Sequence, residues 1–85
     1  MNADDEILQS FDGILSIYKM PIITIFRRPK DYPDSFVARI FDLENPTKYI
    51  IIAEMFADIR SYRPFYMGIF PRNDWDDYTI VESWI

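Results

Sequence analysis

The 85-residue sequence contains no cysteine and no histidine. Without cysteine the chain has no disulfide, no thiolate nucleophile and no zinc–thiolate site, a composition that fits a reducing compartment. The missing histidine and cysteine also remove the commonest catalytic bases and the easiest nucleophile. The sequence therefore predicts a protein that is not an enzyme.

Glycine and long apolar runs are also scarce. The two glycines, Gly13 and Gly68, stand alone, so the chain has no glycine-rich phosphate loop. No apolar run approaches the roughly 18 residues of a membrane span. The first ten residues, MNADDEILQS, are acidic where a secretory signal would be basic. We expect a cytoplasmic protein with no membrane segment and no cofactor.

A short acidic run, DWDD at 74–77, contains carboxylates of the kind that bind calcium. It lacks the glycine turn and the distal glutamate of an EF-hand loop. The sequence therefore predicts a surface turn here and no metal site.

The charge of the chain is unevenly distributed. The net charge of −5 disfavours direct nucleic-acid binding, which needs Lys and Arg to neutralise phosphates. Residues 1–18 hold four acidic residues and no basic one, and so do residues 74–85. The middle, 19–73, holds all nine basic residues against six acidic ones. The excess of negative charge is thus expected at the two ends of the chain.

Hydrophobic periodicity predicts the element order α-β-β-β-α-(β)-β. Residues 4–18 carry apolar side chains at steps of three and four, which is typical of an amphipathic helix: Ile7, Leu8, Phe11, Ile14, Leu15 and Tyr18. Alternating, β-branched and aromatic residues predict four strands, at 22–28, 35–43, 47–53 and 78–85. A short helix is expected at 54–62, and a further short strand or an extended crossing at 65–70.

These elements predict one domain, residues 1–85, of the α+β class. Short turns between the first three strands favour an antiparallel meander. Its sheet of four or five strands would carry two helices in a two-layer sandwich. In the strand at 35–43, Phe36, Ala38 and Ile40 share one face, and Phe36 and Ile40 are expected in the core. Apolar residues on both faces of 22–28 predict a strand that is covered on both sides.

The segment RPKDYPD, residues 28–34, interrupts the strands. Its two prolines cannot donate to a sheet ladder and its aspartates favour turns, so we expect a hairpin loop with solvated charges. The alternative is a contact surface made of Tyr32 with the arginines Arg27 and Arg28.

Two family resemblances rest on these residues. The stretches KDYPDSFVARIFD, PTKYIIIAE and IVESWI, within residues 22–85, resemble a pattern in small uncharacterised proteins of bacteria and their mobile elements. The order β-β-β-α-β is similar to the HicB-type antitoxin domain, although the glycine-rich acidic first hairpin of that family is missing. The second resemblance implies a domain that binds a protein toxin.

Acidic residues mixed with aromatic ones are the remaining functional signal. Carboxylates spaced on a rigid surface can take the place of phosphates in the basic groove of another protein, and a buried aromatic side chain can anchor the contact. We therefore expect an acidic protein-binding module, an inhibitor of a nucleic-acid-handling partner as anti-CRISPR proteins and antitoxins are. The expected partner-binding residues are Asp74, Trp75, Asp76 and Asp77, with Asp4, Asp5 and Glu6.

Two alternatives remain open at this point. One is a weak RNA- or DNA-binding module that uses Arg27, Arg28, Lys30, Arg63 and Arg72. The other is a structural domain that closes a homodimer through its aromatic residues.

Overall fold

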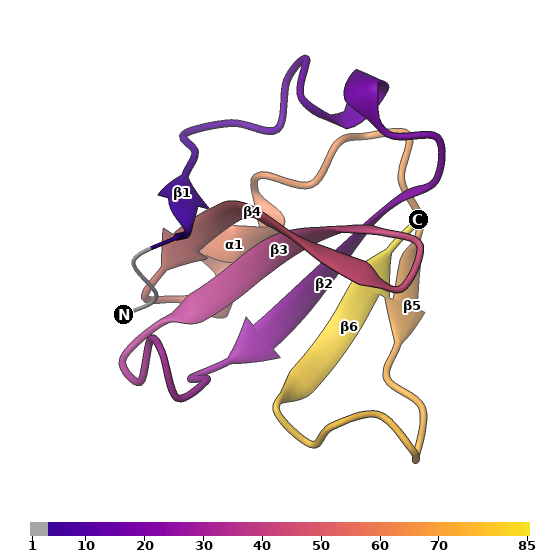
Figure 1. Ribbon diagram of the computed structural model, residues 1–85. Helices are drawn as coiled ribbons and strands as arrows, with labels where there is room; N and C mark the ends of the chain where they lie inside the picture. Colours follow the sequence, from indigo (N-terminus) through magenta and orange to yellow (C-terminus); the bar gives the residue numbers. More distant parts are fainter. Residues whose placement is uncertain (1–3) are drawn as a thin grey trace.

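The computed structural model of the protein describes residues 4–85, which form a six-stranded mixed sheet (Figure 1). The strands lie in the order β1-β4-β3-β2-β6-β5. Their bounds are β1 Glu6–Ile7, β2 Pro21–Arg27, β3 Phe36–Asp42, β4 Asn45–Ala53, β5 Ile69–Pro71 and β6 Ile80–Trp84. A 3₁₀ helix spans Leu15–Ile17, and the α-helix α1 spans Phe56–Arg60.

The centre of the sheet is the predicted antiparallel meander. β2 pairs with β3, where Ile23 faces Ile40, and β3 pairs with β4, where Ala38 faces Ile51. Because side chains alternate along each strand, these four residues lie on one face and are almost completely buried. The predicted meander and the predicted core position of Ile40 are confirmed.

The chain returns to this meander through β6, which inserts between β2 and β5. Thr24 of β2 faces Ser83 of β6, and Phe70 of β5 faces Ser83 from the other side. Trp84 is fully buried. The expected final strand is therefore confirmed, and the segment at 65–70 contributes the short strand β5.

The predicted two-layer α+β sandwich with two helices is wrong. Within residues 4–85 the only α-helix is α1, which is five residues long, and strands make up most of the regular structure. The sheet is also not purely antiparallel, because β1 runs parallel to β4. No helix in the described part of the chain reaches the length and hydropathy of a membrane span.

The helix expected at 4–18 does not form because local and distant contacts compete with it. Gly13 has a φ of +81°, outside the right-handed helical region. The Asp12 amide donates to Ser10 Oγ at 2.9 Å, a local bond that replaces a helical one. The Leu8 amide donates to the carbonyl oxygen of Ile50 at 2.7 Å, which continues the pairing of β1 with β4. The segment is thus a short strand followed by a turn and the 3₁₀ helix, and not one continuous α-helix.

The apolar side chains of this segment still reach the core without a helix. Phe11 and Leu15 are buried against the sheet, and Leu8, Ile14 and Tyr18 pack beside them. Together with α1 this segment covers one face of the sheet, which we call the core face. The main cluster on that face contains Phe11, Leu15, Ile23, Ile25, Ala38, Ile40, Ile51, Ile59, Met67 and Trp84.

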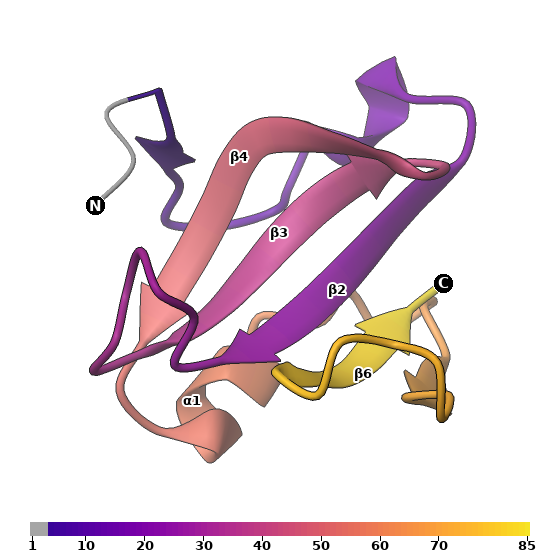
Figure 2. The same cartoon turned by 60° about the horizontal axis from the view of Figure 1, so that its bottom comes forward.

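The opposite surface of the sheet, which we call the open face, is covered only in part. Tyr32, from the loop after β2, packs on Val37 and Ile50 in a second, smaller cluster. In Figure 2 the segment that leads from β1 to the 3₁₀ helix passes behind the sheet, and the loops that follow β2 and β5 lie in front. The prediction that β2 is covered on both sides is therefore correct for only part of its length.

Candidate functional site

A buried ion pair lies at the β1 end of the open face. Arg39 Nη1 and Nη2 donate to the Asp5 carboxylate at 2.8 and 3.0 Å, and Arg39 Nη1 also donates to the Thr47 carbonyl oxygen at 2.7 Å. The Tyr32 hydroxyl donates to Asp5 Oδ2 at 2.9 Å. The side chain of Asp5 is only 2% exposed. This carboxylate therefore ties the N-terminal segment to the sheet and is not presented to a partner.

The protonation states of this cluster follow from the same contacts. The hydrogen bonds from Arg39 hold the pKa of Asp5 below its ordinary value, against the effect of burial. Burial raises the pKa of Tyr32, and its hydrogen bond to Asp5 raises it further. Asp5 is thus the anion and Tyr32 the neutral donor. The alternative in which Tyr32 is a contact residue of the 28–34 loop does not fit its buried position.

The acidic residues of the two chain ends are not brought together. Glu6 is half exposed in β1 and forms an ion pair with Lys48 at 3.9 Å, and Asp4 is exposed beside it. β1 and β5 are the opposite ends of the sheet order, and Figure 1 places them on opposite sides of the molecule. Asp74, Asp76 and Asp77 follow β5, so the predicted set of partner-binding residues divides into two separate groups.

The loop between β5 and β6, residues 72–79, is shaped by its own aspartates. Asp76 Oδ2 accepts from the Asn73 amide at 2.9 Å. Asp77 Oδ1 accepts from the amide and from the hydroxyl of Thr79, each at 2.9 Å. These bonds from Thr79 lower the pKa of Asp77. The two carboxylates therefore hold the backbone of the loop.

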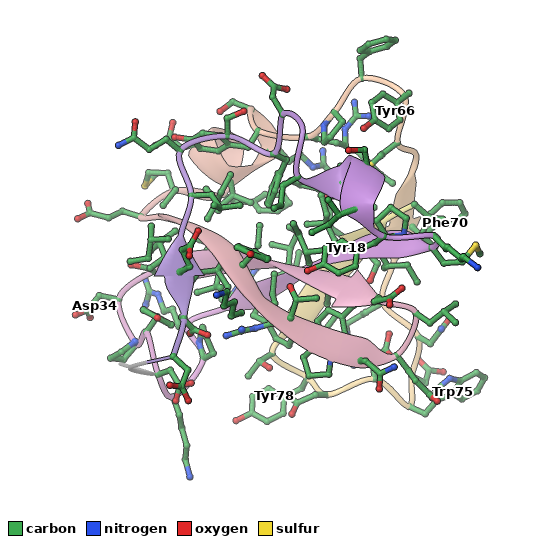
Figure 3. The ribbon with its side chains drawn as sticks, turned by 45° about the horizontal axis from the view of Figure 1, so that its top comes forward. Tyr18, Asp34, Tyr66, Phe70, Trp75 and Tyr78 are labelled. Atoms are coloured by element: carbon green, nitrogen blue, oxygen red, sulfur yellow. The ribbon has the colours of Figure 1, made fainter. Side chains whose placement is uncertain are left out.

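Two aromatic side chains project from this loop. Trp75 and Tyr78 are each 86% exposed, although both are large and partly apolar. Figure 3 shows both rings directed outward, away from the sheet. Exposed aromatic residues beside carboxylates are the kind of surface that binds another protein, since burying each ring on contact removes a large apolar area from water.

Two hollows lie one after the other along the open face of β2. The first, of about 490 Å³, is lined by Ile22 and Thr24 of β2, by Phe41 of β3, and by Phe70 of β5, with Asp76 at its rim. The second, also about 490 Å³, is lined by Phe26 of β2, by Pro29 to Asp31, and by Asp77 to Thr79. The loop at 72–79 borders both hollows, so the exposed aromatic residues and the hollows belong to one side of the molecule.

The basic residues of the nucleic-acid alternative come from three segments of the chain. Arg27, Arg28 and Lys30 are exposed at the end of β2, and the Arg27 guanidinium lies 5.9 Å from the centre of the Phe36 ring. Arg63 Nη1 donates to the carbonyl oxygen of Met67. Arg72 lies in the acidic loop after β5.

Sequence reasoning missed a second buried ion pair, on the core face. Arg60 donates to Glu82 through Nε at 3.0 Å and through Nη2 at 2.6 Å, and Trp84 Nε1 donates to the same carboxylate at 2.8 Å. Burial raises the pKa of Glu82, but the bonds from Arg60 and Trp84 outweigh it and lower the pKa overall. The signal was present in the sequence, because Glu82 and Trp84 are two residues apart in a strand and share a face.

The lining of the first hollow was missed for a different reason. Phe41 and Phe70 lie 29 positions apart, and only the pairing of β6 with both β2 and β5 brings them to one surface.

Within residues 4–85, no three acidic side chains gather closely enough to hold a metal ion. Comparison of the chain with protein-family models, curated proteins and solved structures found no match.

Proposed function

We propose that the protein is a non-enzymatic protein-binding module whose contact surface is centred on the 72–79 loop. The observation that carries this proposal is the 86% exposure of Trp75 and Tyr78 beside three carboxylates. The bonds of Asp76 and Asp77 to the loop backbone support it further, because a loop that is already ordered loses less conformational entropy on binding.

The partner class that we propose is a nucleic-acid-handling protein, which the module inhibits as anti-CRISPR proteins and antitoxins do. Asp74, Asp76 and Asp77 would occupy part of a basic groove in place of phosphates, and Trp75 would fill an adjacent apolar pocket. The net charge of −5 supports this choice, since it favours encounter with a basic surface and opposes direct binding to nucleic acid. Asp5 has no part in this contact, because it is buried.

The proposal is tested with a photo-crosslinking residue at position 75 in the full chain, expressed in its native host. The captured protein is purified and its binding measured. Trp75→Ala should speed dissociation about fivefold or more, as the loss of an aromatic anchor does. Phe65→Ala is the matched control, because Phe65 is 93% exposed and lies outside the 72–79 loop.

Competition separates the inhibitor from a plain adaptor. The partner's own nucleic acid should displace the module, or be displaced by it, and the association rate should fall with added salt. Converting Asp74, Asp76 and Asp77 together to Asn should slow association. Simultaneous binding of module and nucleic acid to one partner would overturn the inhibitory mechanism, and a partner whose binding survives Trp75→Ala would overturn the contact surface.

A further inference from the structure

The first hollow on the open face combines an apolar floor with polar groups at its centre and its rim. Ile22, Phe41 and Phe70 supply apolar surface from three neighbouring strands. Between them the hydroxyls of Thr24 and Ser83 lie 3.3 Å apart across the β2–β6 pair. Apolar walls with a few placed polar groups are typical of surfaces that receive a ligand.

The rim of this hollow includes a residue in an unfavourable backbone conformation. Leu43 has a φ of +57° in the two-residue turn between β3 and β4. Its side chain lines the hollow and is about half exposed. Within residues 4–85 the second turn residue, Glu44, does not share the positive φ. A hairpin turn with a positive φ at its first position only is one that glycine favours. The chain thus keeps a leucine where glycine fits better, and the leucine side chain forms a wall of the hollow.

Charge selects among possible occupants. The loop that borders both hollows carries three carboxylates against the single guanidinium of Arg72. At the second hollow the charges of Lys30 and Asp31 offset each other, so the excess of negative charge comes from this loop. A second copy of this chain would bring a net charge of −5 against the same acidic rim, and nucleic acid would be repelled more strongly. A segment that carries lysine or arginine beside apolar side chains complements both the floor and the rim.

The shape of the surface favours an extended segment. The two hollows lie over alternate residues of one strand, from Ile22 to Phe26, which is about 13 Å at the rise of a β-strand. Gly68 and Ile85 exchange both backbone hydrogen bonds. Because bonded and non-bonded pairs alternate along an antiparallel ladder, the backbone of Pro71 faces outward at the free edge of β5, where proline has no amide hydrogen to donate. A strand of the partner is therefore not expected to pair with this edge. Binding is therefore expected through side chains over the open face and not by addition of a strand to the sheet.

We infer that the hollows over β2 receive an extended segment of the partner protein in which apolar residues alternate with lysine or arginine. This inference rests on the proposed function and names the chemistry of the partner at a second part of the same surface. Trp75 and the acidic loop would then hold the flank of the segment whose apolar side chains occupy the floor between Phe41 and Phe70.

The test uses the full chain labelled with ¹⁵N and an acetylated seven-residue peptide of alternating lysine and leucine. We expect the amide shifts to map to Thr24, Phe41 and Ser83, around the first hollow. The matched peptide with glutamate in place of lysine should bind about tenfold more weakly or worse at low salt. Shifts that map to another surface, or equal binding of the two peptides, would overturn the inference.

Variants of the lining residues test the location of the peptide-binding site independently of the amide shifts. Phe70→Ala should weaken the lysine–leucine peptide about fivefold. Leu43→Gly should also weaken it while leaving a well-dispersed amide spectrum, since glycine suits the turn. Phe65→Ala is the control and should leave the affinity unchanged. Unchanged affinity in Phe70→Ala would also count against the inference.

The two proposals fail separately. If a partner is crosslinked through position 75 while the peptide leaves the hollows unperturbed, the inference fails and the proposed function stands. If partner binding survives Trp75→Ala, the proposed function fails, and the peptide titration still decides whether the hollows bind a basic, apolar segment.

Discussion

Replacement of Glu82 is the sharpest test of how this small sheet is held together. The carboxylate is almost fully buried on the core face and accepts three hydrogen bonds, two from Arg60 and one from Trp84. Glu82→Ala removes both acceptor oxygens and so all three bonds at once. Glu82→Gln keeps the shape of the side chain and one acceptor oxygen but removes the charge.

The expected magnitudes follow from what each variant leaves behind. In Glu82→Ala, the indole N–H of the fully buried Trp84 has lost its acceptor, which costs about 1–3 kcal/mol, and the bonds to a charged group are lost as well. The side chain of Arg60 is 44% exposed, so its guanidinium regains water and its part must be discounted. We expect about 3 kcal/mol for Glu82→Ala and about 1–2 kcal/mol for Glu82→Gln.

Urea unfolding followed by tryptophan fluorescence measures both variants. The experiment uses a Trp75→Phe background, because Trp75 is highly exposed and Trp84 then reports alone from the site itself. Glu54→Gln is the matched control, since Glu54 is exposed and should change the free energy of unfolding by less than about 0.5 kcal/mol.

The lowered pKa of Glu82 also predicts how its contribution to the free energy of unfolding changes with pH. Folding lowers the pKa of Glu82, so its contribution is present above pH 4.5, the ordinary pKa of a glutamate, and is lost as the pH falls through the folded-state value. The difference between wild type and Glu82→Gln should therefore shrink in acid. A Glu82→Ala cost below about 1 kcal/mol at pH 7, or a Gln difference that grows in acid, would show that this buried carboxylate does not stabilise the fold through its charge.

Three further outcomes are expected. Ile40→Ala should cost about 2–5 kcal/mol in urea unfolding by leaving a cavity at a fully buried position, and a cost below about 1 kcal/mol would contradict its place in the core. Asp5→Asn should lower the free energy of unfolding by about 1–3 kcal/mol at pH 7, because it removes the negative charge of the buried carboxylate that accepts from Arg39. Asp74→Asn should change it by less than about 0.5 kcal/mol. The lowered pKa of Asp5 predicts that this difference shrinks as the pH falls below the ordinary range of an aspartate, so a difference that grows in acid would be inconsistent with it. Deletion of residues 82–85 should leave a protein without sharp amide spectra, because it removes Trp84 and the centre of β6, and a well-dispersed spectrum would place that segment outside the core.

Strands were predictable from the sequence where the pattern is local. Alternation and β-branched residues located β2, β3, β4 and β6 to within two residues at each end. The N-terminal segment was not predictable in this way, because its apolar spacing is that of a helix and its course is decided by partners far along the chain. Asp5 meets Arg39 and Leu8 meets Ile50, and no pattern within residues 4–18 contains that information.

Some properties of the surface were predictable from the sequence and others were not. The acidic and aromatic character of the 72–79 loop is evident from its residues, and a turn was expected there. The burial of Asp5, the partition of the acidic residues between two edges of the sheet, and the hollow between Phe41 and Phe70 all depend on strand order. Strand order follows from the global packing of side chains, which sequence periodicity does not encode.

The position of β6 between β2 and β5 also sets an order of events during folding. The meander of β2, β3 and β4 closes through short turns, whereas Thr24 and Ser83 are 59 positions apart. Closing that longer loop costs about 1 kcal/mol more in chain entropy than closing a hairpin of about 15 residues. The meander is therefore expected to be largely formed in the transition state, while β6 and the buried Trp84 join it late. Substitutions in β3 should slow folding, and substitutions around Trp84 should mainly speed unfolding.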